Sequence, residues 1–172
     1  MLLGYAAFCW LRADYVQAQG WRQLDAPVIP GSLMTLHEGD AVGSIQIPSL
    51  HLSTVIFEGS TESTLAVGVG HVSGTGYPGK PGNVVLAGHR DSFFRPLEKV
   101  RVGDRIEVTS NGQSAVYEVK NTRIVDPSEV SVMASTGGHT VTLITCYPFF
   151  YVGSAPKRFI VQGVEKSVSY TP

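Results

Sequence analysis

Three residues whose types together support acyl transfer lie at the ends of segments predicted to be strands. Cys146 ends the segment TVTLITC, His89 comes shortly after NVVLA, and Arg158 is the second residue of KRFIVQG. A thiolate attacks a carbonyl carbon, while a histidine takes the thiol proton and returns it to the leaving amine. A guanidinium stabilises the negative charge that develops on the carbonyl oxygen. We therefore predict that Cys146 is the nucleophile, His89 the acid and base, and Arg158 the stabilising cation.

The alternative for Cys146 is a buried, unreactive thiol, which is the common fate of a single cysteine. The chain has only two cysteines, Cys9 and Cys146, so we expect no disulfide framework. If thiol and imidazole titrate independently at their reference pKa values, thiolate and imidazolium coexist in about 1% of molecules near neutral pH. The site then either contains an ion pair or works through a small competent fraction.

Short strands and tight turns are predicted to position these residues. Glycine and proline are frequent, with 19 and 10 residues, and are spread along the chain, which argues against a helical bundle. Asn111 and Gly112 between two alternating segments predict a hairpin. The sequence therefore predicts a mainly β fold, an eight-stranded antiparallel or mixed barrel with an N-terminal helix and one or two short helices. The predicted strands are 42–48, 50–58, 83–87, 104–109, 113–120, 122–125, 140–146 and 157–163.

The glycine-rich segment and the overall charge each argue against one class of function, nucleotide binding and nucleic-acid binding. Residues 68–82 are rich in glycine but lack the Gly-Lys-Ser/Thr ending of a phosphate-binding loop, so we interpret them as a plain loop. The 13 Lys and Arg residues nearly balance the 14 Asp and Glu residues, which gives no support for nucleic-acid binding. Short helical segments are expected at 60–67, 92–99 and 127–134.

The N-terminal residues are predicted to lie outside the catalytic domain. Residues 1–11 are apolar on all sides but too short to span a bilayer, which takes about 20 residues. We interpret 1–26, with a helix at 13–24, as an apolar segment and helix that remain from a membrane anchor. The alternative is an amphipathic helix that packs on the domain. Residues 27–41 are expected to be a linker or arm, and 42–172 the catalytic domain.

The segments around the three residues resemble those of sortases. TLITC matches the TLxTC signature of that family, LAGHRD resembles its histidine segment, and Arg158 lies on the next predicted strand, where the family keeps its arginine. The resemblance covers about 42–163. GHRDSFFRPLEKVRVGDRIEV and TCYPFFYVGSAPKRFIVQG are most similar to class D sortases.

This resemblance implies an eight-stranded barrel and a cysteine transpeptidase. The implied substrate is a secreted protein with a Leu-Pro-x-Thr-x-like C-terminal sorting signal, cleaved at the threonine carbonyl through a thioacyl-enzyme. The implied acceptor is an amine such as a cell-wall precursor or a pilin lysine. The implied place is the bacterial cell membrane, with the catalytic domain extracytoplasmic. We expect no cofactor and no metal, because no Cys, His, Asp and Glu cluster has ligand spacing. The alternatives are a mainly hydrolytic cysteine peptidase and a catalytically silent peptide-binding barrel.

Two further residues are predicted to bind substrate. Thr145 matches the family threonine, and it is expected either to hydrogen-bond near the substrate or to orient the cysteine. Tyr147 begins a run of aromatic residues that is expected either to wall a peptide groove or to anchor its loop to the barrel. His71 is a candidate to support the cleft, with an ordinary polar loop residue as its alternative. Asp91 is expected to cap the short helix that follows it.

Overall fold

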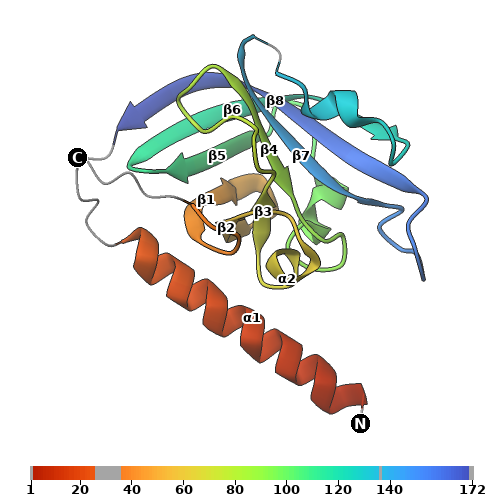
Figure 1. The fold of residues 1–172 in the computed structure, drawn as a ribbon. Coiled ribbons are helices and arrows are strands. Elements are labelled where there is room, and N and C mark those ends of the chain that lie inside the picture. Colours follow the sequence, from red (N-terminus) through yellow and green to blue (C-terminus); the bar gives the residue numbers. More distant parts are fainter. Residues whose placement is uncertain (1, 26–35, 136, 171–172) are drawn as a thin grey trace.

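The computed structural model describes residues 2–25, 36–135 and 137–170, and the strands close into one barrel (Figure 1). The strands are β1 (Ala41–Ile47), β2 (Leu52–Glu58), β3 (Val69–His71), β4 (Gly82–Ala87), β5 (Arg105–Ser110), β6 (Gln113–Val125), β7 (His139–Tyr147) and β8 (Lys157–Tyr170). The helical elements are α1 (Leu2–Leu24), α2 (Glu62–Leu65) and three short 3-10 helices, η1 (Pro48–Leu50), η2 (Arg95–Lys99) and η3 (Val130–Met133).

The order of strands around the barrel is β1-β2-β3-β4-β7-β8-β6-β5, and β5 pairs with β1 to close it. The pairs β2–β3 and β4–β7 are parallel, and the other neighbouring pairs are antiparallel. The predicted mainly β fold with an eight-stranded barrel and an N-terminal helix is confirmed. The parallel pairing of β4 with β7 places the carboxyl ends of both strands at the same end of the barrel.

The alternation of side chains along β7 decides which residues face the core. Val141 and Leu143 are fully buried in the barrel interior with apolar residues from the other strands. Because successive side chains of a strand point to opposite faces, Thr142, Ile144 and Cys146 lie on the outer face. The strand therefore turns one row of apolar residues into the barrel, while the other row lies on the outer face, where Thr142 is buried and Cys146 is half-buried.

Two details of the strands differ from the prediction. Residues 69–71 form β3 within the segment that we expected to be a loop, because a strand of three residues is too short to show a period. The two strands predicted at 113–120 and 122–125 are one strand, β6, whose pairing with β8 shifts between Val119 and Asn121. The total of eight strands is thus right, although one strand was missed and another was divided.

Helix α1 joins the predicted apolar run and the predicted helix into one element of 23 residues. Its second half packs Val16, Trp21 and Leu24 against the outer side of β2. Gly20 permits this approach, because a Cβ there would lie 2.8 Å from the side chain of Val55. The predicted linker falls largely on 26–35, outside the described residues.

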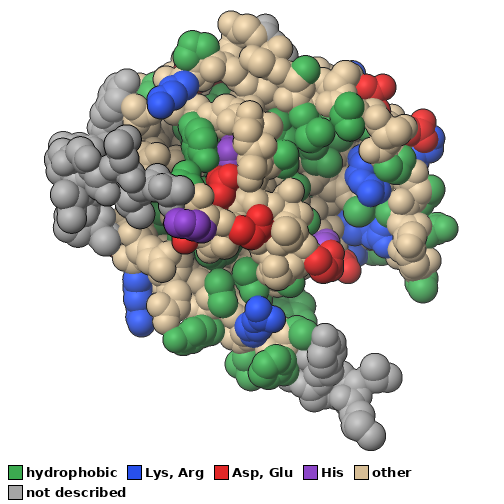
Figure 2. Space-filling view, in the orientation of Figure 1, with side chains coloured by type: hydrophobic (Ala, Val, Ile, Leu, Met, Phe, Trp, Pro, Cys, Tyr) green, Lys and Arg blue, Asp and Glu red, His purple; other side chains and the backbone are tan. Residues whose placement is uncertain are grey.

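The first half of α1 carries exposed apolar side chains. Phe8, Trp10, Leu11 and Tyr15 are all more than half exposed, and Figure 2 shows hydrophobic side chains along this lower edge of the molecule. Within the described residues, none of the helices combines the length and the apolar character that crossing a membrane requires.

Candidate active site

Cys146 and Arg158 are direct cross-strand partners. The antiparallel pairing of β7 with β8 sets Cys146 opposite Arg158 and Thr145 opposite Phe159. Residues directly opposite each other in such a ladder have side chains on the same face, with Cβ atoms about 4.5–5.5 Å apart. Both residues are half-buried, and Cys146 is a free thiol. The fold therefore places a permanent positive charge beside a partly accessible thiol.

His89 is brought to the same end of the barrel by the parallel pairing of β4 with β7. Ala87 pairs with Ile144, and the amide of Gly88 donates to the carbonyl of Ile144 at 3.1 Å. Two residues further along each strand, His89 lies level with Cys146. The structure thus gathers the three predicted catalytic residues at adjacent ends of β4, β7 and β8.

The imidazole of His89 has one ionic neighbour in the described residues. Its Nε2 atom lies 3.4 Å from the Oε1 atom of Glu62 at the start of α2, and the Glu62 side chain is 89% exposed. A carboxylate this exposed holds the ring only weakly, because water screens the interaction. The ion pair therefore restrains His89 only lightly.

The guanidinium of Arg158 is held by two backbone carbonyls where the β7–β8 loop meets β8. Its Nη1 atom donates to the carbonyl of Ala155 at 3.3 Å and to that of Lys157 at 3.0 Å. A guanidinium has five N–H donors, so others remain available to a carbonyl oxygen of a bound molecule. The orientation of the cation thus depends on where the loop carbonyls lie.

Thr145 and Tyr147 do not share the outer face with Cys146. The Thr145 side chain is 2% exposed, and its hydroxyl donates to the carbonyl of Gly88 at 2.7 Å. Tyr147 packs on the core, with its ring centroid 6.1 Å from that of Phe149 and 6.3 Å from that of Phe159. Thr145 therefore fastens β7 to the segment of His89, and Tyr147 closes the end of the barrel.

Comparison with known proteins identifies the family of this fold and site. The model of the sortase domain matches residues 45–166, which is most of the chain. This chain belongs to the sortase family. The assignment made from TLITC and its surroundings is thereby confirmed. Sortases are cysteine transpeptidases.

Individual sortases are similar in sequence and in structure. The chain is 38% identical to Sortase D of Bacillus subtilis (strain 168) over 126 residues, which are 73% of this chain and 64% of that relative. It is 36% identical to Sortase A of Listeria monocytogenes over 141 residues, 78% of this chain and 62% of the relative. It thus spans less than two thirds of the length of both. The solved structure of a Clostridium perfringens Sortase D5 transpeptidase matches with a TM-score of 0.78 and 27% identity, covering 90% of this chain and 98% of that one.

The β7–β8 loop of this sortase, residues 148–156, is held by two arginines that the sequence did not single out. Arg90 donates from Nη2 to the carbonyls of Tyr151 at 2.9 Å and Gly153 at 3.0 Å. The guanidinium of Arg95 lies 4.0 Å from the centre of the Phe150 ring. Both arginines lie in the segment that follows His89, but their roles could not be predicted because their contacts join segments that are distant in sequence.

His71 belongs to a buried polar network, not to the cleft of this sortase. We call the group of Glu58, His71, Ser73, Thr75 and Tyr77 the Glu58 network. His71 is 2% exposed, and its Nδ1 atom lies 2.8 Å from Oε2 of Glu58. Ser73 and Tyr77 also donate to the Glu58 carboxylate, at 2.7 and 3.0 Å. The alternative that His71 serves the structure is therefore favoured over a role beside Cys146.

The ionisation of the Glu58 network follows from its contacts. Burial raises the pKa of Glu58, but hydrogen bonds from Ser73, His71 and Tyr77 outweigh it, so its pKa lies below the ordinary value. Burial and the Glu58 charge raise the pKa of Tyr77 to about 12. Nε2 of His71 faces the carbonyl of Gly76 at 3.1 Å and a Thr75 hydroxyl whose hydrogen goes to Val72. Both ring nitrogens of His71 thus have hydrogen-bond partners within the protein.

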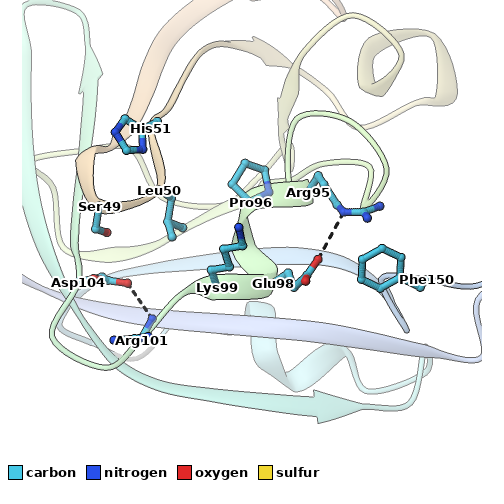
Figure 3. A pocket seen from close by; sticks show the side chains of 10 residues that line it. All are labelled: Ser49, Leu50, His51, Arg95, Pro96, Glu98, Lys99, Arg101, Asp104 and Phe150. Carbon is cyan, nitrogen blue, oxygen red and sulfur yellow. Dashed lines mark hydrogen bonds and ion pairs between the residues drawn. The ribbon is translucent and has the colours of Figure 1, made fainter.

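A separate pocket of about 820 Å³ opens between η1 and η2 (Figure 3). It is lined by Ser49, Leu50, His51, Arg95, Pro96, Glu98, Lys99, Arg101, Asp104 and Phe150, and thus includes none of the three predicted catalytic residues. Both carboxylates that line the pocket already have partners in the protein. Glu98 pairs with Arg95 at 3.4 Å, and Asp104 accepts a hydrogen bond from the amide of Arg101 at 2.7 Å. Phe150 connects one side of this pocket to the β7–β8 loop.

The predicted capping role of Asp91 is wrong, because η2 begins at Arg95, its N-cap residue is Phe94, and no side chain caps it. Among the described residues, no group of three or more His, Cys, Asp and Glu side chains is arranged to hold a metal ion.

Proposed function

We propose that this chain is a cysteine transpeptidase that cleaves a C-terminal sorting signal of the Leu-Pro-x-Thr-x kind. The observation that carries the proposal is the pairing of Cys146 with Arg158 across β7 and β8, with His89 two residues beyond the end of β4, whose Ala87 pairs with Ile144. A nucleophile, a proton carrier and a fixed cation are the groups that acyl transfer from a peptide bond requires.

In the first half-reaction the Cys146 sulfur attacks the threonine carbonyl carbon of the signal. The thiol proton is taken up by His89, and negative charge develops on the carbonyl oxygen, where Arg158 donates hydrogen bonds. The carbon–nitrogen bond then breaks, and His89 protonates the departing amine. The product is a thioester between Cys146 and the signal, and the downstream peptide is released.

In the second half-reaction an amine attacks the thioester carbonyl, again next to Arg158. His89 accepts a proton from the amine, a new amide bond forms, and the Cys146 sulfur leaves and regains its proton. Thr145 acts through position in both steps, because its hydroxyl bond to Gly88 fixes the spacing between β7 and the segment of His89. Tyr147, at the end of the barrel, contacts the bound peptide.

The substrate class sets the partners and the place of action. The acylated partner is a secreted protein with a sorting signal, and the acceptor is an amine such as that of a cell-wall precursor or a pilin lysine. The reaction takes place at the bacterial cell surface, with residues 42–172 as the catalytic domain and 27–41 as a linker. The exposed Phe8, Trp10 and Tyr15 of α1 support contact of residues 1–26 with the membrane.

Incubation with a sorting-signal peptide library, with and without an added amine, tests this function. Mass spectrometry is expected to detect the amine-linked N-terminal fragment and a thioacyl adduct on Cys146. Cleavage that ignores the amine would identify a hydrolytic cysteine peptidase. Absence of cleavage and of any adduct, even with a reactive substrate mimic, would identify a peptide-binding barrel without catalytic activity.

A further inference from the structure

The β7–β8 loop joins the two strand ends that carry Cys146 and Arg158. Its first part is anchored, because Phe149 is buried against the core. Its middle is exposed: Phe150 is 71% exposed, Tyr151 is about half exposed, and Val152 is almost fully exposed. Apolar packing therefore does not fix the middle of the loop, and its conformation depends on contacts from elsewhere.

Arg90 supplies the polar contacts of the loop middle. One nitrogen of its guanidinium donates to the carbonyls of Tyr151 and Gly153, and the group lies 5.8 Å from the centre of the Tyr151 ring. Hydrogen bonds from a charged donor are roughly twice as strong as those between neutral groups. Both acceptors are backbone atoms, so Arg90 holds the course of the chain and not a particular side chain.

The segment that carries Arg90 is itself fixed. The carbonyl of His89 accepts a hydrogen bond from the amide of Phe94 at 3.0 Å. Phe94 and Leu97 are fully buried in the barrel core, and a Cβ at Gly88 would lie 2.7 Å from the Phe94 ring. Because the backbone on both sides of Arg90 packs closely against the core, the Arg90 side chain ties the loop to a rigid part of the barrel.

The loop in turn positions the cation beside the thiol. Arg90 holds the carbonyl of Gly153, and two residues later the carbonyl of Ala155 accepts a hydrogen bond from Nη1 of Arg158. A displacement of the middle of the loop thus moves an acceptor that orients the Arg158 guanidinium.

We propose that Arg90 is a positioning residue for acyl transfer: it fixes the β7–β8 loop, and the loop fixes the guanidinium of Arg158. This inference rests on the proposed function, in which Arg158 stabilises the carbonyl oxygen. Arg90 contacts neither the thiol nor the imidazole in the structure, so its effect is transmitted through the loop backbone.

A double-mutant cycle on the full chain tests this path. We expect Arg90→Ala to lower kcat/KM for a sorting-signal peptide and an amine about tenfold, because small misplacements of a reacting group are costly. In the Arg158→Ala background the same substitution should cost less than twofold, since the group that it positions is gone. Equal losses in both backgrounds, or no loss when Arg158 is present, overturn the proposal.

Two further variants serve as a partial rescue and as a control for this cycle. Arg90→Lys should recover part of the loss, because an ammonium donates to the same carbonyls without the geometry of the fork. Arg101→Ala is the matched control: this exposed arginine has no side-chain partner among the described residues, and its loss should leave kcat/KM unchanged.

Limited proteolysis supplies a measurement that needs no turnover. Chymotrypsin cuts after aromatic residues, and Phe150 and Tyr151 are exposed. In the Cys146→Ala background, Arg90→Ala should accelerate cleavage at these two sites about tenfold, because the open loop becomes more populated, while Arg101→Ala does not. An unchanged cleavage rate overturns the proposal.

The two measurements separate the failure of this inference from that of the proposed function. If the wild-type chain forms no product with peptide and amine, the proposed function fails, and proteolysis still decides whether Arg90 holds the loop. If Arg90→Ala lowers the melting temperature of the whole domain, Arg90→Lys replaces it in both experiments, with a smaller shift of the same sign expected.

Discussion

Two histidines at the ends of neighbouring strands have opposite surroundings. His71 of β3 is enclosed, and each of its ring nitrogens has a protein partner in the Glu58 network. His89, which follows β4, is 29% exposed, and among the described residues its one ionic neighbour is the exposed Glu62. Side chains whose polar atoms are satisfied within the protein stabilise the fold, whereas those left open to solvent can bind and transform another molecule.

The comparison predicts opposite consequences of substitution in the two regions. Changes at the open site should lower activity and leave stability nearly intact. Changes in the Glu58 network should lower stability and leave the activity of the folded fraction nearly intact. The predictions below test this separation, beginning with the largest expected effect.

Cys146→Ala should abolish both cleavage and transfer, a loss of roughly 10³-fold or more, because no other group forms the thioester. The melting temperature should change little, since the side chain is half-buried on the outer face. Product formation and thermal unfolding are measured together. Cys9→Ala removes the other, exposed thiol and should change neither quantity. Residual turnover near the wild-type level in Cys146→Ala would remove this residue from the mechanism.

His71→Ala should destabilise the domain by about 3 kcal/mol, because it removes one of the buried hydrogen-bond partners of the Glu58 carboxylate. Denaturant unfolding measures the loss. His37→Ala is the control, since this histidine is exposed and lies 3.6 Å from Asp40 at the surface; its effect should stay within about 0.5 kcal/mol. If His71→Ala remained stable but lost activity per folded molecule, the two histidines would not differ in the way described.

Arg158→Ala should lower kcat/KM about 10²–10³-fold, which is the usual cost of removing one stabilising donor from an oxyanion site. Stability should fall by less than in His71→Ala, because the guanidinium is half-buried and donates to two backbone carbonyls, those of Ala155 and Lys157. Lys157→Ala, next to it, removes an exposed ion pair with Asp126 at 2.7 Å and should leave activity unchanged. Equal losses in the two variants would mean that charge at this end of the barrel, and not the position of Arg158, is what matters.

The pH dependence of stability should show the smallest effect. The pKa of Glu58 lies below its ordinary value of 4.5 in the folded state, so its contribution is present above pH 4.5 and is lost as the pH falls through the folded pKa. The melting temperature of the wild type should therefore fall more steeply below pH 4.5 than that of Glu58→Gln, by roughly 2–4 °C. Parallel curves would show that the carboxylate is not preferentially ionised in the fold.

The sequence predicted the fold and the end of the barrel that carries the site, because both depend on local signals. Strand periods, the Asn111-Gly112 turn and the TLITC segment all lie within short stretches of chain. The direction of individual side chains depended on register, which a single strand does not reveal. The sequence therefore left two roles open for Thr145 and two for Tyr147, and only the register shows that Thr145 is buried and that Tyr147 packs on the core. Arg90, Glu62 and the partners of His71 are contacts between distant segments, which local sequence patterns do not encode.

The pairing of Tyr147 with Lys157 and of Cys146 with Arg158 closes the β7–β8 loop at its base. The distance between the backbones of Cys146 and Arg158 is set by two strands of the barrel, whatever the number of residues between them. The loop can therefore gain or lose residues without separating the two backbones at its base, since a longer surface loop adds little entropic cost. Evolution and protein engineering can thus vary the loop, and with it the orientation of the guanidinium, while the strand pairing at its base is inherited unchanged.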